Sequence, residues 1–312
     1  MRHFLVTGGA GFIGSHLAHA LVARGETVRV LDNFLTGKRE NLADVADAID
    51  LLEGDLRDPD DCRRACDGVD VVYHEGALPS VPKSVEDPLA SHQANVDGTF
   101  NILLAARDAG VKRLVYAASS SAYGDTPTLP KVEDMPPSPL SPYAVQKLTG
   151  EFYCKTFYDC FGLQTLSLRY FNVFGPRQDP ASQYAAAIPA FVTAILKDQP
   201  PTIYGDGEQT RDFTHVDNVV HANLLAADAP ETHGEAINLA CGERVSVNQI
   251  IAAINQALGK SVEPKYVDTR PGDVKHSLAD ISLARKVIGF EPKILFEEGL
   301  ALAIDWYRQN LA

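Results

Sequence analysis

The sequence predicts an α/β protein built on a doubly wound parallel sheet, with a smaller α/β lobe in its C-terminal part. Two observations predict this class. Short apolar runs alternate with helical segments through the first half of the chain, an order typical of parallel sheets covered by helices on both faces. A glycine-rich turn also stands between the first apolar run and the first helical segment, as in Rossmann-type domains.

The first element in order is this glycine-rich turn, which reads Val-Thr-Gly-Gly-Ala-Gly-Phe-Ile-Gly over positions 6–14. Glycines let the backbone turn sharply and approach a phosphate without a Cβ in the way. The start of the following helix offers free N–H groups and a partial positive charge. We therefore expect the turn to hold the pyrophosphate of a dinucleotide, through Gly8, Gly11, Phe12, Ile13 and Gly14.

The second strand, predicted at 28–32, ends in an acid. Asp32 lies 18 residues after Gly14, close to the spacing of about 20 that is typical of a ribose-binding acid. A carboxylate at this point accepts hydrogen bonds from the adenine ribose and repels a 2′-phosphate, so the sequence favours NAD over NADP. Glycine turn, helix, strand and acid together make this prediction far stronger than the glycines alone.

Further strands are predicted at 49–55, 69–74, 112–118 and 164–169, with helical segments around 59–67, 92–109 and 142–160 between them. Ligands of such sheets bind at the carboxyl ends of the strands. That rule points Asp55, His74–Ala77 and Ser119–Tyr123 into one crevice. The proline-rich stretch 129–142 is predicted to be a loop rather than a linker between independent domains.

The loop leads into Ser-Pro-Tyr-Ala-Val-Gln-Lys at 141–147, where Pro142 can open a helix. Tyr143 and Lys147 then share one helix face. A free tyrosine has a pKa of about 10, but a nearby ammonium and an oxidised nicotinamide both favour the phenolate. The phenolate could take a proton from a substrate hydroxyl while hydride leaves the same carbon. A tyrosine–lysine pair is often only a surface feature, but downstream of a dinucleotide fold catalysis is the better interpretation.

Composition limits the other functions. The chain has 312 residues, a net charge of −13 and a pI near 5.1, which argues against nucleic acid or an anionic membrane as the main partner. No apolar run approaches the roughly 20 residues that span a bilayer. The N-terminus enters a strand at once and leaves no room for a signal peptide. The five cysteines are scattered, which fits a cytoplasmic protein with reduced thiols and no metal.

These motifs make the chain resemble the extended short-chain dehydrogenase/reductase superfamily. Within it, the chain is most similar to the NAD-dependent nucleotide-sugar epimerases, and in particular to UDP-glucose and UDP-N-acetylglucosamine 4-epimerases. The resemblance covers essentially the whole chain. It rests on the glycine pattern, on Asp55-Leu56, on Ser119 with the Tyr143/Lys147 pair, and on Arg-Tyr-Phe-Asn-Val-Phe-Gly at 169–175.

The resemblance implies a role for particular residues. The catalytic set is Ser119, Tyr143 and Lys147, and the adjacent Ser120 and Ser121 leave the serine register open. Besides the glycine turn and the catalytic pair, the cofactor set comprises Asp32, Asn33, Asp55, Leu56, Ala77, Asn95 and Tyr170. The substrate set comprises Ser121, Tyr143, Asn172, Tyr204, Arg211, Arg270, Asp273 and Ser277, with the two arginines on the diphosphate and Asp273 on the uridine ribose.

The resemblance also implies how the chain is divided and assembled. We expect an NAD-binding Rossmann domain from 1–172 plus about 212–236. A UDP-sugar-binding lobe is expected from about 173–211 and 237–312. The helices around 92–109 and 142–160 correspond to those that pair in the family's dimers, so we expect a homodimer. One departure stands out: the stretch after the fourth strand reads His-Glu-Gly-Ala, and Glu75 adds a carboxylate that either faces the cofactor or points away.

The implied reaction is epimerisation at C4 of a UDP-hexose through a transient 4-keto sugar, with NAD regenerated and retained. A small residue at Ser277 is expected to admit the N-acetyl group of UDP-N-acetylglucosamine and UDP-N-acetylgalactosamine beside the plain sugars, because a bulky ring would fill that space. Alternatives are a UDP-uronate 4-epimerase or decarboxylase, a dehydratase, and a non-catalytic NAD-binding scaffold. A dehydratase would carry an acid pair where Ser120 and Ser121 stand. A scaffold would not need the intact Tyr143/Lys147 pair.

Overall fold

The computed structural model describes residues 1–179, 187–269 and 275–311. Its centre is a seven-stranded sheet in the order β11-β6-β5-β4-β1-β2-β3, and every neighbouring pair in it is parallel. The strands are β1 (His3–Thr7), β2 (Thr27–Asp32), β3 (Ile49–Glu53), β4 (Val71–His74), β5 (Arg113–Ser119), β6 (Gln164–Tyr170) and β11 (Ala236–Leu239). The predicted α/β class with a doubly wound parallel sheet is confirmed.

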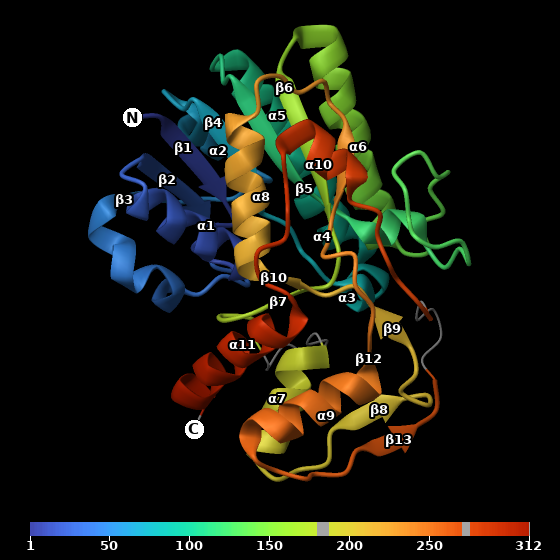
Figure 1. Cartoon of the computed structure of the whole chain (residues 1–312). Coiled ribbons are helices and arrows are strands. Elements are labelled where there is room, and N and C mark those ends of the chain that lie inside the picture. Colours follow the sequence, from blue (N-terminus) through green and yellow to red (C-terminus); the bar gives the residue numbers. More distant parts are fainter. Residues whose placement is uncertain (180–186, 270–274, 312) are drawn as a thin grey trace.

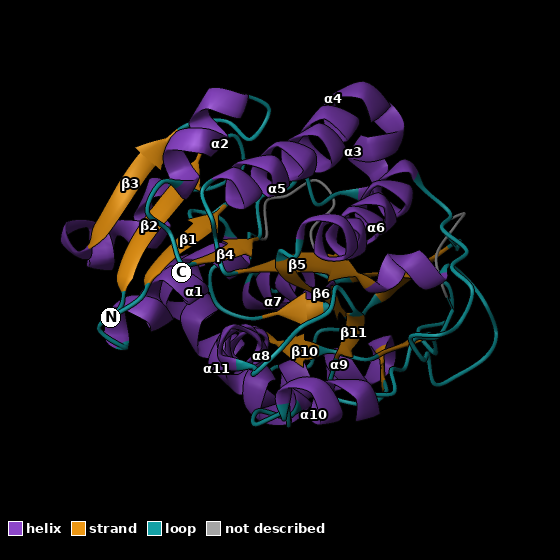
Figure 2. Cartoon of the chain, turned by 90° about the horizontal axis from the view of Figure 1, so that it is seen from above, coloured by secondary structure: helices purple, strands orange, loops and turns teal. Residues whose placement is uncertain are grey.

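Helices cover both faces of this sheet, as Figure 2 shows. One face is covered by α1 (Phe12–Ala23), α8 (Val216–Asp228), α10 (Ser282–Ile288) and the 3-10 helical segment Arg39–Ala48. The other face is covered by α2 (Pro59–Cys66), α5 (Gly98–Asp108) and α6 (Pro142–Phe161). Apolar side chains of the strands alternate between the two cores, which is why the buried strands read as nearly continuous apolar runs.

The six predicted strands are present at the expected positions, but the seventh, β11, was not predicted. It has four residues, Ala-Ile-Asn-Leu, too few for a periodicity to stand out. The predicted helix at 92–109 begins earlier, at Pro88, where Asp87 caps α4 (Pro88–His92) by accepting from the N–H of Ala90. The segment then continues through a π-helical turn (Gln93–Asp97) into α5.

A second, smaller unit lies beyond the carboxyl ends of the strands, in the lower part of Figure 1. Helices α7 (Ala187–Leu196), α9 (Val247–Leu258) and α11 (Phe296–Leu311) pack around their own apolar core. Short strands accompany them: β8 (Thr202–Tyr204) with β13 (Lys265–Val267), and β9 (Thr210–Arg211) with β12 (Val245–Ser246). The division of the chain stays a proposal, in which about 212–236 returns to the large unit and 237–312 belongs to the lobe.

The remaining elements lie at the junction between the two units. Strands β7 (Val173–Phe174) and β10 (Thr214–His215) pair in parallel, and α3 (Val81–Glu86) precedes α4. Strand order reverses between β1 and β4, because β2 and β3 extend the sheet on one side and β4, β5 and β6 on the other. Such a switch point opens a crevice at the carboxyl ends of the strands. In the described part of the chain, no helix is long and apolar enough to cross a membrane.

Candidate active site

The glycine turn after β1 is shaped by close backbone packing. Gly8 has φ of +64°, and a Cβ there would lie 2.7 Å from the Cα of Gly76, in the loop after β4. A Cβ on Gly14 would lie 2.3 Å from the carbonyl oxygen of Gly8. Gly11 is the N-cap of α1 and leaves the helix start without a side-chain cap. The glycines therefore allow the turn to pack tightly, and the uncapped helix start fits a bound pyrophosphate.

Asp32 ends β2 beside this turn and is 7% exposed. Its carboxylate accepts from the backbone N–H of Ala10 at 2.9 Å and of Phe34 at 2.8 Å. Burial raises the pKa of this carboxyl, and the two backbone hydrogen bonds oppose the rise. The structure thus places the acid at the predicted position, where it also ties the glycine turn to β2.

The residues predicted to contact adenine form a second cluster at the end of β3. Asn33 donates to the carboxylate of Asp55 at 2.9 Å. Arg57, which was not singled out from the sequence, pairs with the same carboxylate at 2.6 Å, and these hydrogen bonds hold the pKa of Asp55 well below its usual range. Leu56 packs beneath Gly76, since a Cβ on that glycine would lie 2.6 Å from the leucine Cδ1.

The predicted catalytic pair, Tyr143 and Lys147, lies in the first turns of α6. Ser141 caps this helix by accepting from the N–H of Ala144 at 3.2 Å, and Pro142 occupies its first turn. The backbone N–H of Tyr143 donates to the hydroxyl of Ser84 at 3.1 Å. The buried Tyr143 phenol lies beside Ser119; burial raises the pKa of this phenol, and its interaction with the serine hydroxyl lowers it.

Lys147 is 4% exposed and is held from two directions. Its ammonium donates to the carbonyl oxygen of Ala117 at 2.7 Å and lies 5.0 Å from the centre of the Tyr116 ring. Burial lowers the pKa of Lys147 to about 8, and the nearby carboxylate of Glu75 opposes that shift. The lysine is therefore still mostly protonated at neutral pH.

The serine cluster after β5 has a definite order in the structure. The hydroxyl of Ser121 donates to that of Ser119 at 2.9 Å, and the N–H of Ser121 donates to the same oxygen at 3.2 Å. Ser119 thus stands between Ser121 and Tyr143. The sequence did not tell which of the three adjacent serines takes the predicted catalytic position, because they are identical side chains at consecutive positions at the exit of β5.

Glu75, the departure noted in the sequence, lies in the crevice. Its carboxylate accepts from the hydroxyl of Tyr170 at 2.7 Å, and that hydroxyl accepts from the amide of Asn223 at 2.9 Å. Asn223 comes from α8 and had no signal in the sequence. The predicted cofactor residue Tyr170 is therefore oriented by groups from the loop after β4 and from α8.

Asn95 lies in the π-helical turn and is 1% exposed. Its side chain accepts from the N–H of Leu78 at 2.7 Å and donates to Gln146 at 2.9 Å. These bonds anchor the loop that follows Ala77 to α6. A contribution of Asn95 to cofactor binding stays a prediction. These hydrogen bonds would let Asn95 contribute indirectly, by holding in place the loop that follows Ala77.

The predicted substrate residues Asn172 and Ser277 are brought together from distant parts of the chain. The amide of Asn172 donates to the Ser277 hydroxyl at 3.2 Å and to the carbonyl oxygen of Asp212 at 3.1 Å. Arg211 ends β9, directly before Asp212, and donates to the carbonyl oxygen of Lys275 at 3.1 Å. Tyr204 ends β8. The two further predicted residues, Arg270 and Asp273, lie outside the described residues.

Asp212 was not predicted as a site residue, although its side chain makes three hydrogen bonds to the backbone in this region. Its carboxylate is fully buried and accepts from the N–H groups of Cys241, Gly242 and Ala279 at 3.0, 3.1 and 3.2 Å. Burial raises the pKa of Asp212 to about 6. The three bonds fasten the segment containing Ser277 to the end of β11.

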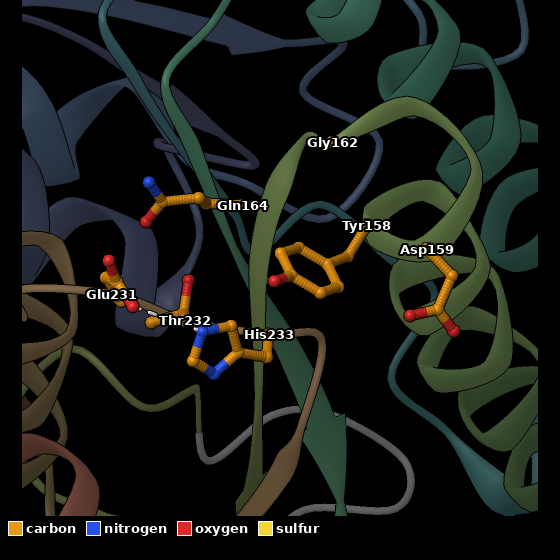
Figure 3. Close-up of a pocket in the computed structure, with 7 residues that line it drawn as sticks. All are labelled: Tyr158, Asp159, Gly162, Gln164, Glu231, Thr232 and His233. Carbon is orange, nitrogen blue, oxygen red and sulfur yellow. Dashed lines mark ion pairs between the residues drawn. The ribbon is translucent and has the colours of Figure 1, made fainter.

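A cavity of about 490 Å³ lies elsewhere, between the C-terminal end of α6 and the start of β6. Figure 3 shows Tyr158 and His233 next to one another in its lining, with their ring centres 5.3 Å apart. A 20-residue helix is about 30 Å long, and Tyr143 lies at the other end of α6. This cavity is therefore separate from the crevice that holds the catalytic pair.

Comparison with known proteins agrees with this geometry. The model of the NAD dependent epimerase/dehydratase family matches residues 4–240. A UDP-N-acetylglucosamine 4-epimerase from Methanobrevibacter ruminantium, solved with UDP-N-acetylmuramic acid, is 41% identical and superposes with a TM-score of 0.95, with 99% of each chain covered.

Two UDP-glucose 4-epimerases are also similar over nearly the whole length. The structure of the Thermus thermophilus enzyme in complex with NAD is 38% identical with a TM-score of 0.89, covering 98% of this chain and 99% of that one. The Mycolicibacterium smegmatis enzyme is 38% identical over 310 residues, 98% of each chain. With its glycine turn, acid and catalytic pair in one crevice, the chain belongs to the NAD dependent epimerase/dehydratase family.

Proposed function

We propose that this protein is an NAD-dependent UDP-hexose 4-epimerase. It would interconvert UDP-glucose with UDP-galactose and UDP-N-acetylglucosamine with UDP-N-acetylgalactosamine. The observation that carries the proposal is the buried Tyr143 phenol, which lies beside Ser119 and shares its helix with the buried Lys147 ammonium. Its support comes also from the similarity to enzymes named for these two activities.

The residues present fit NAD. The uncapped start of α1 and the glycines beneath it would hold the pyrophosphate, Asp32 the adenine ribose, and the cluster of Asn33, Asp55 and Leu56 the adenine. When bound, NAD supplies an acceptor for hydride from the sugar C4 and returns that hydride to the opposite face. The residues of the chain would bind and orient both molecules and carry the proton.

Proton transfer falls to Tyr143. Burial raises the pKa of its phenol, so the phenolate forms only when positive charge stands near it. The Lys147 ammonium supplies part of that charge, and its bond to Ala117 keeps it in place. Ser119, which lies beside the phenol, would position the sugar 4-hydroxyl. Tyr143 would accept the hydroxyl proton as C4 is oxidised and return it when C4 is reduced.

Substrate recognition would be divided between the two units. Arg211 and Arg270 would bind the diphosphate as planar cations, Asp273 and Tyr204 would contact the uridine, and Asn172 would lie between nucleotide and sugar. The sugar itself must turn over within the crevice, so it would be held loosely while the nucleotide is held firmly. The hydroxyl of Ser277 already bonds Asn172 and would leave room for an acetamido group beside it.

We also propose a homodimer. Large apolar side chains are exposed on α4 and α6, where Leu89 is 66% and Phe152 is 61% exposed, and Phe100 on α5 is 36% exposed. Removing these side chains from water favours association of two copies. We further propose a cytoplasmic location, supported by five cysteines that are all free.

The test is to incubate the purified protein with the two UDP-hexose pairs and with UDP-glucuronate, and to identify the products by NMR. Denatured protein is analysed in parallel for released NAD. The expected result is C4 epimerisation of the neutral sugars without added cofactor. Conversion of only the uronate, with or without loss of CO₂, would favour the alternative as a UDP-uronate epimerase or decarboxylase. No conversion with NAD still bound would favour a non-catalytic NAD-binding protein.

A further inference from the structure

Glu75 lies at the switch point of the sheet, directly after β4. Its neighbour Gly76 packs against Gly8 of the glycine turn, where an added Cβ would lie 2.7 Å from the Gly76 Cα. Glu75 is therefore on the wall between the phosphate-binding turn and the catalytic pair. Glu75 is half-buried at this position.

The carboxylate is oriented toward the catalytic pair by its partners. It accepts from Tyr170 at 2.7 Å, and Asn223 in turn donates to Tyr170 at 2.9 Å. The charged or titratable groups that face it are Tyr170 from β6 and Lys147 and Tyr143 from α6; its own neighbour His74 is bonded instead to Thr7 and Thr99. Burial lowers the pKa of Lys147 and raises the pKa of Tyr143. The negative charge of Glu75 is a smaller cause in both cases, and it acts upward on both pKa values.

A bound nicotinamide would have to lie in the same space. Hydride transfer requires the reacting carbons to approach to about 3–3.5 Å, and the sugar carbon must carry a hydroxyl within reach of Tyr143. The ring must therefore lie beside the phenol whose pKa responds to Glu75. The oxidised ring carries a positive charge, and the reduced ring carries none.

We propose that Glu75 is a positioning residue that sets the redox balance of the bound cofactor, by stabilising NAD⁺ relative to NADH. The crevice already contains the Lys147 ammonium, which by itself disfavours a second cation. The Glu75 carboxylate offsets that repulsion. Each turnover moves two electrons and one hydrogen from sugar C4 to the ring and one proton to Tyr143, and then reverses both. The carboxylate opposes accumulation of NADH between the oxidation of sugar C4 and its reduction. This inference rests on the proposed function only in taking NAD as the bound cofactor.

The protonation state of Glu75 is consistent with this role. Burial raises the pKa of its carboxyl to about 7, while the hydrogen bond from Tyr170 and the charge of Lys147 oppose that rise. A cationic ring nearby lowers the same pKa further, because two groups that attract one another stabilise each other's charged forms. The oxidised cofactor thus favours the charged form of the carboxylate.

The test compares Glu75→Gln with the wild type and with Glu263→Gln, which removes an exposed carboxylate from the C-terminal unit. The amide introduced by Glu75→Gln can still accept from Tyr170, so the variant removes charge and keeps the hydrogen bond. The first measurement is the rate at which dimethylamine–borane, a neutral hydride donor, reduces the bound NAD⁺ in the absence of sugar. The Glu75→Gln protein should react about tenfold faster, because its ring is more electrophilic without the nearby anion. The Glu263→Gln protein should react as the wild type does.

The second measurement is the fraction of bound NADH after equilibration with UDP-glucose, which should rise in the Glu75→Gln protein alone. As the pH falls below the pKa of Glu75, the reduction rate of the wild type should approach that of this variant. Unchanged reduction rates in Glu75→Gln would overturn the inference, whether or not the protein epimerises sugars. Faster reduction without epimerisation would retain the inference and reject the proposed function.

Should the Glu75→Gln protein be isolated without cofactor, its affinities for NAD⁺ and NADH carry the test. Weaker binding of NAD⁺ with NADH binding retained supports the role of the carboxylate. Equal loss of affinity for both forms contradicts it and assigns Glu75 a purely structural part in holding Tyr170.

Discussion

Replacing Tyr143 with phenylalanine removes one hydroxyl from the centre of the crevice. The fold around it does not depend on that hydroxyl, because the start of α6 is held by the Ser141 cap and by the bond from the Tyr143 backbone to Ser84. Ser119 keeps its bonds from Ser121 at 2.9 and 3.2 Å. The stability cost should therefore stay near the value of one hydrogen bond, about 1 kcal/mol.

The effect on the reaction should be much larger. Loss of the group that accepts and returns the proton costs about 10²–10⁴-fold in rate. At about 1.36 kcal/mol for each tenfold change, the barrier rises by about 3–5 kcal/mol. Because the hydroxyl contributes to the transition state more than to nucleotide binding, kcat should fall while KM for the UDP-sugar changes little.

The assay combines steady-state kinetics, NAD released on denaturation, and thermal melting. Tyr158→Phe is the matched control, since Tyr158 lies on the same helix at the cavity in Figure 3 and away from the catalytic pair. It should keep wild-type activity. A Tyr143→Phe protein that binds NAD and turns over at the wild-type rate would refute the mechanism.

Three further predictions follow from the same structure. Asp32→Ala should reduce the preference for NAD over NADP by about tenfold or more, because it removes the carboxylate that repels a 2′-phosphate. The dissociation constants of the two cofactors measure this preference, and the melting temperature separately reports the loss of the hydrogen bonds to Ala10 and Phe34. Ser277→Tyr should lower kcat/KM for the acetylated pair far more than for the plain pair, because a phenol ring would fill the space of the acetamido group, and equal losses would show that this position does not control the pocket. Light scattering should give a mass above the 33.8 kDa of one chain, and Phe152→Asp should reduce it by placing a charge in the exposed apolar face; a monomer at micromolar concentration would exclude the dimer.

Much of this protein follows from local sequence. Six strands, the glycine turn and the start of α6 were predictable, because each depends on neighbouring residues: apolar runs, glycine without a Cβ, and a Ser-Pro pair that caps and opens a helix. The early start of the helical segment at Pro88 has the same kind of signal in Asp87 and the proline after it. The short strand β11 does not, because four residues carry too little pattern and its place depends on pairing with β6.

The site divides in the same way. Local sequence already indicates the chemical groups: an acid after β2, a tyrosine and lysine on one helix face, and a serine cluster at a strand exit. These groups follow from short spacings along the chain. Packing in three dimensions places Ser119 beside Tyr143 and brings Glu75 to face the catalytic pair. It also brought Asn223 from α8 to Tyr170, and Asp212 to the segment that carries Ser277. Those contacts join residues far apart in the chain. The side chains meet because helices and strands pack together, and a local sequence pattern does not predict such contacts.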